Sequence, residues 1–308
     1  MNGDKISVNS LQANICLICV TLCWSTEVII FACIPDSVPP FATTCLTSFA
    51  GALLLGFFFY RHIREQLRKH GKRILGRCLL LGVLNCVYNN LYLFGLKYLD
   101  VSSGAFTLSM TVVVLPVILL TLKQKVGIRT WISACLVFAG ILLAVGSNAG
   151  AGQLWGVLIM VAGCIVRAVH IVILNRYASE DDPISISLFI SVIVGVISGA
   201  LWFVSDPSGV AGIPWNKEII ASIAIYSYFI VAFAQTLNIF AQKKSTPANA
   251  TIIYSMEIVF SVIWGLILPG NIIENTVLTP WIVAGVILVV SGNLVEICPS
   301  PKRRANET

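Results

Sequence analysis

Long apolar stretches are the feature that most constrains how this chain can fold. Ten of them, each about 18 to 23 residues long, are separated by polar breaks, and a helix of roughly 20 apolar residues crosses the ~30 Å hydrocarbon core of a bilayer. We therefore expect an all-α polytopic membrane protein with ten transmembrane helices. The expected spans are 13–34, 41–60, 76–96, 103–122, 130–147, 154–174, 184–204, 219–241, 247–268 and 280–297.

Composition excludes the soluble alternatives. Hydrophobic residues make up 57% of the chain, charged residues make up 11%, and the mean hydropathy is +0.89. A soluble domain carries roughly 25% charged residues, so this chain has too few to cover its surface against water. A soluble enzyme, a disordered chain and a nucleic-acid binder are therefore excluded. We expect the lipid bilayer to be its surroundings and no nucleic acid to be a partner.

The distribution of lysine and arginine predicts the orientation of the helices. If the N-terminus is cytoplasmic, every basic residue lies on the cytoplasmic side except Lys97, Lys217 and Arg167, which lies inside a helix. Basic residues favour that side of a membrane. We therefore expect both termini and the basic loop 61–77 to be cytoplasmic in a multi-pass protein of the cell (inner) membrane. The first stretch lacks a cleavage site of small residues, so it is expected to be a retained helix.

An internal repeat divides the chain into two halves. Residues 88–111 align with 234–257 at an offset of 146, and both windows join the third helix of a five-helix half to its fourth. Because five is odd, the second half enters the membrane upside down. Such inverted repeats are typical of secondary transporters, whose binding site lies near the midplane between the halves. The expected repeats are 1–150 and the inverted 151–308.

Several segments resemble a known family of carriers. Cys23-Trp24-Ser25-Thr26 is similar to a Trp-Gly-x-x motif, and 92–104 looks like that family's connection from the third helix to the fourth. The segment 108–146 resembles its fourth-to-fifth-helix pattern, and 253–292 repeats it. The chain thus resembles the EamA branch of the drug/metabolite transporter superfamily over essentially its whole length. The resemblance implies a ten-helix carrier of small metabolites, amino acids among them, which works by exchange or proton coupling.

Ionisable residues inside the spans are the strongest functional signal, because a charge at the bilayer centre costs at least ~2.5–3.5 kcal/mol. They are Glu27, Arg167, His170 and Glu257. Either Glu27 or Glu257 pairs with Arg167 to hold the bundle together, or these groups face an aqueous cavity and bind substrate. Two carboxylates against one arginine leave a carboxylate without a full partner, which makes it a candidate proton site.

Polar side chains are expected to surround these charges on single faces of three helices. Amide groups facing lipid would leave donors unsatisfied, so the faces should point inward, either to bind substrate or to hydrogen-bond between helices. Among them we expect Asn89, Tyr92, Gln235 and Asn238 to contact substrate, with Trp24 and Trp264 as walls. The three faces are Asn85, Tyr88, Asn89 and Tyr92; Tyr228, Gln235 and Asn238; and Tyr254, Glu257 and Ser261.

Nothing in the sequence resembles an enzyme site, since it has no GxxxxGK loop, GxSxG elbow or HExxH motif. Cys16-x-x-Cys19 has the spacing of metal ligands but no second pair and no nearby histidine. No enzyme activity, cofactor or metal is therefore expected. We expect a monomer or homodimer.

Three functions remain open on sequence grounds. Acids, one arginine, amides and aromatic rings match a substrate with both an ammonium and a carboxylate. This favours a secondary transporter, an exporter or exchanger of small polar metabolites such as amino acids, with protons as a candidate coupling ion. The first alternative is a proton-coupled efflux carrier of organic cations or drugs. The second is a membrane scaffold or receptor that transports nothing.

Overall fold

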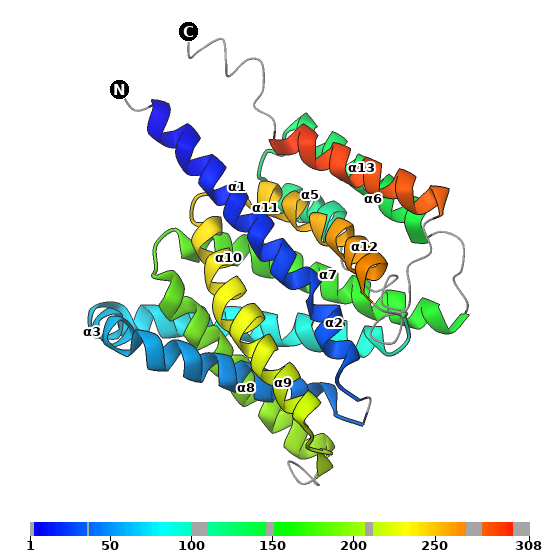
Figure 1. The fold of residues 1–308 in the computed structure, drawn as a ribbon. Helices are drawn as coiled ribbons and strands as arrows, with labels where there is room; N and C mark the ends of the chain where they lie inside the picture. The colour runs from blue at the N-terminus through cyan, green and yellow to red at the C-terminus, as the bar shows by residue number, and fades with distance from the viewer. Residues whose placement is uncertain are drawn as a thin grey trace.

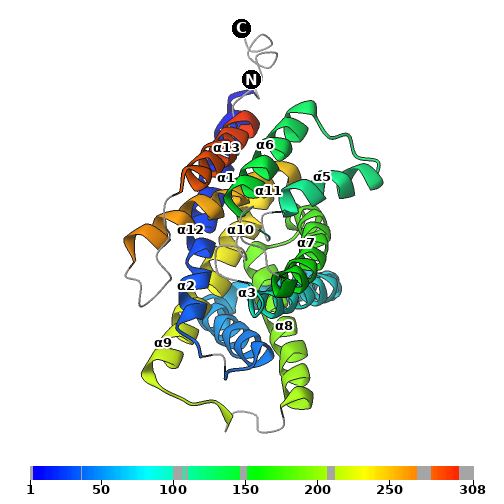
Figure 2. The same ribbon diagram turned by 90° about the vertical axis from the view of Figure 1, so that its right-hand side faces the viewer.

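A computed structural model describes residues 3–35, 37–99, 107, 110–145, 151–206, 212–268 and 279–297, and over these residues the chain is helical and contains no strand. The helices pack into one bundle, with α6 and α13 at one edge and α3 and α8 toward the other (Figures 1 and 2). The helices are α1 Gly3–Ser25, α2 Glu27–Ala32, α3 Pro40–Leu96, α5 Thr111–Thr121, α6 Ile128–Val145, α7 Ala151–Ala178, α8 Pro183–Ser205, α9 Lys217–Tyr226, the π-helix η2 Ser227–Ala234, α10 Gln235–Gln242, α11 Pro247–Tyr254, α12 Met256–Ile267 and α13 Pro280–Ile297.

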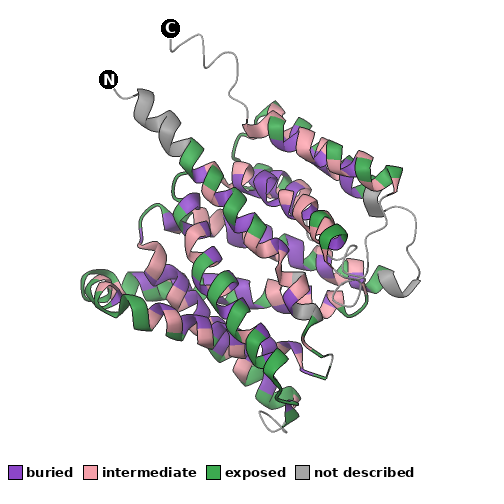
Figure 3. Ribbon diagram, viewed as in Figure 1, coloured by how far each residue is buried: buried purple, intermediate pink, exposed green. Residues whose placement is uncertain are grey.

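Six helical segments of the described chain are long and apolar enough to cross a membrane. Three shorter apolar helices accompany them, at Leu11–Ser25, Thr111–Thr121 and Ile128–Leu143. Many large hydrophobic side chains are exposed, which suits a surface that faces lipid. Figure 3 marks the buried and exposed positions along the helices. The six segments are Pro40–Leu96, Leu154–Ala178, Pro183–Ser205, Lys217–Gln242, Pro247–Ile267 and Pro280–Ile297.

Polar caps and prolines define where several helices begin. The Asp182 carboxylate accepts a 2.8 Å hydrogen bond from the Ser185 amide, and Pro183 occupies the first turn of α8. Asn216 caps α9 in the same way at 2.7 Å, and Thr246 caps α11. Such side chains satisfy amides that have no partner inside the helix, and proline is tolerated there because it needs none.

The basic connection 61–77 is helical, where the sequence analysis placed a loop. It lies within α3, which runs from Pro40 to Leu96 and leaves helical geometry inside only at Phe59 and His70. The connection is rich in arginine and lysine, which are good helix formers, and contains no proline. Charge identified this segment as polar, and its high helix propensity explains why it remains helical.

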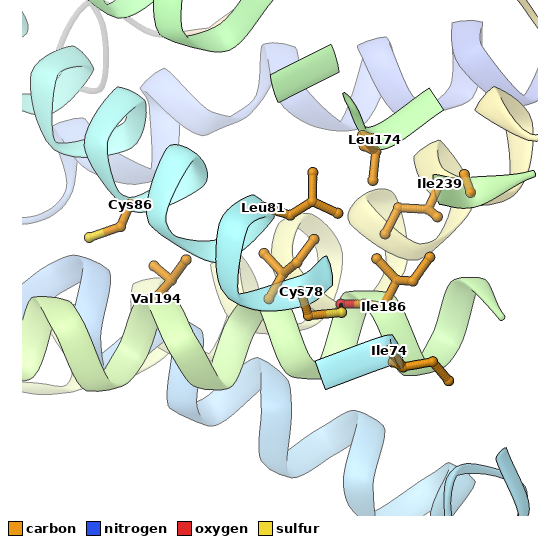
Figure 4. Close-up of a cluster of buried hydrophobic side chains, with 10 residues drawn as sticks. Ile74, Cys78, Leu81, Cys86, Leu174, Ile186, Val194 and Ile239 are labelled. Atoms are coloured by element: carbon orange, nitrogen blue, oxygen red, sulfur yellow. Dashed lines mark hydrogen bonds between the residues drawn. The ribbon is translucent and has the colours of Figure 1, made fainter. Parts of the chain in front are cut away.

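One buried apolar cluster joins the C-terminal part of α3 to α7, α8 and α10. Ile74, Cys78 and Leu81 of α3 meet Leu174 of α7 and Ile239 of α10 (Figure 4), and all five side chains are 1% exposed or less. Ile186, Ile190 and Val194 of α8 complete the cluster. This cluster fixes α3 and α8 relative to α7 and α10, two helices that help to form the candidate site.

The pair α6 and α13 packs through small residues in a symmetric way. A Cβ atom on Gly140 would lie 2.6 Å from the Gly285 carbonyl oxygen, and one on Gly292 would lie 2.9 Å from that of Ser133. Ser133 and Gly140 are seven residues apart, as are Gly285 and Gly292. The two contacts are therefore related by symmetry: if α6 and α13 are interchanged, each contact takes the place of the other. Small residues allow such close approach of helices in a membrane.

An ionic cluster ties α3 to the connection between α7 and α8. The buried Asp181 carboxylate forms ion pairs with the guanidinium groups of Arg73 and Arg77, with N–O distances of 2.5 and 2.7 Å. Arg77 also pairs with the Glu180 carboxylate at 2.6 Å. The next residue, Asp182, lies 3.0 Å from His62. Because the Asp181 side chain is only 1% exposed, its charge depends on these arginines for compensation.

An Asp181→Asn variant is expected to lose about 1–3 kcal/mol of unfolding free energy, because the two arginines lose their buried partner while the shape is kept. Thermal unfolding in detergent measures the loss. The matched control is Glu65→Gln, which removes a carboxylate paired with Lys69 on the exposed face of the same helix and should hardly change the melting temperature. Equal melting temperatures for the two variants would contradict this role of Asp181.

Candidate functional site

A cavity of about 80 Å³ lies in the middle of the bundle and gathers most of the intramembrane charges. Glu27, Arg167 and Glu257 line it together, although they lie on α2, α7 and α12. Such a volume has room for a few water molecules or a compact polar group. The cavity therefore brings three distant charged residues to one place, as proposed from the sequence.

The Arg167 guanidinium is held against aromatic rings. Its central carbon lies 5.2 Å from the Trp24 ring centroid and 5.8 Å from that of Tyr254. Among the described residues, no carboxylate lies within 4 Å of its nitrogens. Ring faces attract a cation but leave its N–H donors available. Arg167 can therefore offer these donors to a carboxylate that enters the cavity.

A hydrogen-bond network fixes the ring of Tyr254. Its hydroxyl donates to the Asn238 side-chain oxygen and accepts a 2.9 Å bond from the Gln242 amide. Both amides belong to α10, and Tyr254 ends α11. The Tyr254 ring packs 5.0 Å from that of Trp24, so the surface beneath Arg167 is held by three helices, α1, α10 and α11.

Glu27 accepts a hydrogen bond of 2.6 Å from the Tyr226 hydroxyl. It is the first residue of α2, and the helical path of the first span breaks at Thr26 just before it. Amides at a helix N-terminus favour a negative charge, and the break places Glu27 at such an end inside the bundle. The break therefore offers partial compensation for a carboxylate far from water.

Glu257 occupies a similar position in the second half. It is the second residue of α12 and follows the break between α11 and α12 at Ser255. The Glu257 side chain is buried, and no described residue donates a hydrogen bond to its carboxylate. Interrupted helices at the centre of a bundle are the usual setting of transporter binding sites. Both carboxylates of the cavity thus lie at helix breaks.

The π-helix η2 changes which side chains of the eighth span share a face. In a regular α-helix, Tyr228 and Gln235 are seven residues apart and lie on one face. The hydrogen bonds of a π-helix join residues five apart and widen each turn, which shifts this phase. Gln235 lines the cavity, whereas Tyr228 is half-exposed on the outside of the bundle. The expected face of Tyr228, Gln235 and Asn238 was therefore wrong for Tyr228.

Asparagines of α3 form a chain along one side of the cavity. The Asn89 amide donates to Asn85 at 2.8 Å, and the Asn85 amide donates to the Tyr88 hydroxyl at 3.0 Å. His170 lies behind Tyr88, with the two ring centroids 5.4 Å apart, and does not line the cavity. The shared helix face of Arg167 and His170 therefore places only the arginine at the cavity.

Most of the expected substrate-binding residues face the cavity, and two lie just behind it. Asn238 accepts a hydrogen bond from the Tyr254 hydroxyl and His170 packs against the Tyr88 ring, and neither of them is part of the cavity lining. Trp24 is a wall of the cavity as expected, whereas Trp264 lies outside its lining and donates a 2.9 Å hydrogen bond to Ser25, which ties α12 to α1. The cavity-lining members of the expected set are Glu27, Asn89, Tyr92, Arg167, Gln235 and Glu257.

The sequence analysis missed several hydroxyl groups of the lining. Tyr226 is the most important, because it holds Glu27. Thr44 and Thr47 of α3 and Ser191 of α8 also line the cavity, but each bonds a carbonyl of its own helix. Threonine and serine do this in many helices, so they gave no clear signal. The only indication in the sequence was that such hydroxyl residues recur four positions apart, as Thr44 and Ser48 do and as Ser187 and Ser191 do.

Comparison with known proteins finds similarity over most of the chain. The model of the EamA-like transporter family matches residues 11–146 and again 154–295. An uncharacterized transporter from Archaeoglobus fulgidus is 22% identical over 260 residues, which cover 84% of this chain and 79% of that protein. A protein of known crystal structure superposes with a TM-score of 0.72 at 16% identity, covering 96% of this chain and 99% of the other. This last likeness concerns the fold alone.

Proposed function

Because this chain belongs to the EamA-like transporter family and is thus a multi-pass membrane transporter, we propose that it carries a small zwitterionic metabolite such as an amino acid. The observation that supports this substrate class is the central cavity, where Arg167 and two carboxylates lie without an ion pair between them. A carboxylate of the substrate would meet Arg167, and its ammonium would meet Glu27 or Glu257. Opposite charges that are not paired with each other select a substrate that carries both.

Alternating access is the proposed mode of transport. We propose ten spans in two inverted halves, because α3 contains two of the expected spans and the family model matches the chain twice. The symmetric contacts of α6 and α13 agree with this arrangement. Rocking of one half against the other would expose the cavity to each side in turn. Net export or exchange, coupled to protons through a carboxylate, completes the proposal.

We propose that the protein lies in the inner membrane of the cell. Both of its termini are then in the cytoplasm. The bend of α3 and the connections from α7 to α8 and from α10 to α11 lie on the left in Figure 1, whereas the connection from α2 to α3 lies at the opposite end. The bend of α3 and the connection from α10 to α11 hold nine of the 20 lysines and arginines, and the connection from α2 to α3 holds none. Basic residues favour the cytoplasmic side.

Reporter fusions test this topology. A reporter after residue 70 is expected to be cytoplasmic and one after residue 210 to be on the other side, since an odd number of the proposed spans separates them. A phosphatase that is active only outside the cytoplasm and a fluorescent protein that folds only in the cytoplasm give opposite readings. Equal compartments for the two positions would contradict the ten-span arrangement.

Flux into proteoliposomes tests the substrate class. Saturable uptake is expected for a labelled amino acid, and the matching amine and the matching carboxylic acid should each be poorer by at least about tenfold, or 1.4 kcal/mol. The panel should include acidic, basic, aromatic and small neutral amino acids. An amine that outperforms its amino acid favours the second candidate below. Absence of saturable flux in folded, inserted protein would favour a non-transporting role.

An organic cation is the second candidate substrate. The observation in its favour is that Glu27 and Glu257 line the cavity together with aromatic rings such as those of Trp24 and Tyr92. Carboxylates and ring faces both attract a cation. In this case Arg167 would repel the substrate, and its removal would increase cation flux instead of abolishing it. The two candidates therefore differ in the sign of one measurement.

A further inference from the structure

A second and larger hollow lies on the outer surface of the bundle. It is a groove of about 960 Å³ between the end of the first half of α3, the start of α8, and the stretch from η2 to α10. Its walls are aromatic and aliphatic, with Phe58, Phe233 and Phe240 well exposed. No residue of its lining belongs to the central cavity. The groove is therefore a separate site that opens toward the surrounding lipid.

One end of the groove is basic. Lys243 and Lys244 follow α10 and are both exposed at the mouth, where the Lys244 amine lies 5.2 Å from the centroid of the Phe240 ring. Asp182 also lines this end, but its carboxylate caps α8 and lies 3.0 Å from His62. The lining at this end thus holds two lysines against one carboxylate that is already hydrogen-bonded within the protein, so a ligand meets a net positive charge.

The length of the groove suits one acyl chain. From Lys243 to Tyr228 the lining extends over 15 residues, which correspond to roughly 20 Å along a helix. Half of a hydrocarbon core is about 15 Å thick, so the groove reaches from the basic end of the bundle to the depth of the bilayer centre. Lysines at the headgroup level with aromatic walls below form a surface that matches a lipid in both charge and polarity.

We propose that this groove binds an anionic phospholipid, with its phosphate at Lys243 and Lys244 and one acyl chain along Phe58, Phe233 and Phe240. Basic pockets between transmembrane helices recognise acidic headgroups in this way. The lipid would pack against η2, whose other side contributes Ile230 and Val231 to the lining of the central cavity. This site does not depend on the identity of the transported substrate.

Photolabelling in liposomes tests the proposal. The probe is a phospholipid with a diazirine in one acyl chain, made with either a phosphatidylglycerol or a phosphatidylcholine headgroup and added to full-length protein. Each lysine near the surface contributes roughly fivefold to acidic-lipid binding, so we expect about 30-fold more labelling of groove peptides by the phosphatidylglycerol probe. Peptide mapping should place the label on residues 54–59 and 228–240.

Matched double variants separate the site from general attraction to the membrane. Lys243→Gln with Lys244→Gln is expected to bring the two probes to nearly equal labelling of the groove. Lys123→Gln with Lys125→Gln removes two exposed lysines elsewhere in the chain, outside the groove lining, and should leave the preference unchanged. Thermal unfolding confirms that both variants fold. Equal labelling by the two probes in the unaltered protein, or label spread evenly over all lipid-facing helices, would overturn the proposal.

Discussion

An Arg167→Gln variant is expected to lose about 100-fold in saturable amino-acid flux, or about 2.7 kcal/mol of binding to the substrate carboxylate. Arg167 is the only basic side chain that lines the described part of the cavity, and its donors are not used by a described carboxylate. Glutamine keeps a donor but has neither the charge nor the forked geometry of a guanidinium. The measurement is the initial rate of uptake into proteoliposomes over a range of substrate concentrations.

Companion variants decide between substrate binding and structural neutralisation. Arg167→Lys keeps the charge but loses the fork, so substrate affinity should fall while the matching amine is less affected. If Arg167 only compensates Glu27, the double variant Arg167→Gln with Glu27→Gln should recover much of the flux, because no buried charge remains without a partner. Persistent loss in the folded double variant supports the substrate role. Arg176→Gln, at the exposed end of the same helix, is the control.

A Glu257→Gln variant is expected to lower flux at least tenfold, or about 1.4 kcal/mol, and to abolish the response of uptake to an imposed pH gradient. Glutamine has nearly the same shape as glutamate but does not bind and release a proton. The Glu257 carboxylate faces the cavity and receives no hydrogen bond from a described residue, so its charge is available to a proton or a substrate ammonium. Uptake is measured with and without a pH gradient across the vesicle membrane.

The control for Glu257 removes an equivalent group far from the cavity. Glu65→Gln lies in the basic connection of α3, where the carboxylate pairs with Lys69 in water. Its flux and its response to pH should match those of the unaltered protein. If Glu257→Gln behaves like Glu65→Gln in both measurements, Glu257 has no part in transport.

The sequence predicted the membrane-protein class and the family, because long apolar runs and the family motifs are both local patterns. Buried charge was an equally direct guide, since Glu27, Arg167 and Glu257 are costly at bilayer depth unless they serve a purpose. The cavity indeed collects all three. Their neighbours Asn89, Tyr92 and Gln235 followed from the rule that polar faces avoid lipid.

Other parts of the site depend on helix irregularities that periodicity does not reveal. The π-helix at 227–234 changes the phase of the helical stretch 217–242, so Gln235 lines the cavity while Tyr228 faces outward. The breaks at Thr26 and Ser255 have no proline or glycine to mark them. His170 shares a face with Arg167 along the chain, yet the ring of Tyr88 stands between it and the cavity.

The exchange of contacts between α6 and α13 has a consequence for how the chain is made. The close-packing face of α6, with Ser133 and Gly140, finds its partners only on the last described helix. About 135 residues separate the end of α6 from the start of α13, and ribosomes add roughly 5–20 residues per second. For roughly 7–27 s of synthesis, the small-residue face of α6 therefore has no α13 to pack against. A stop codon placed before residue 280 would leave that face permanently open, so α6 should be the first helix of the truncated chain that quality-control proteases encounter.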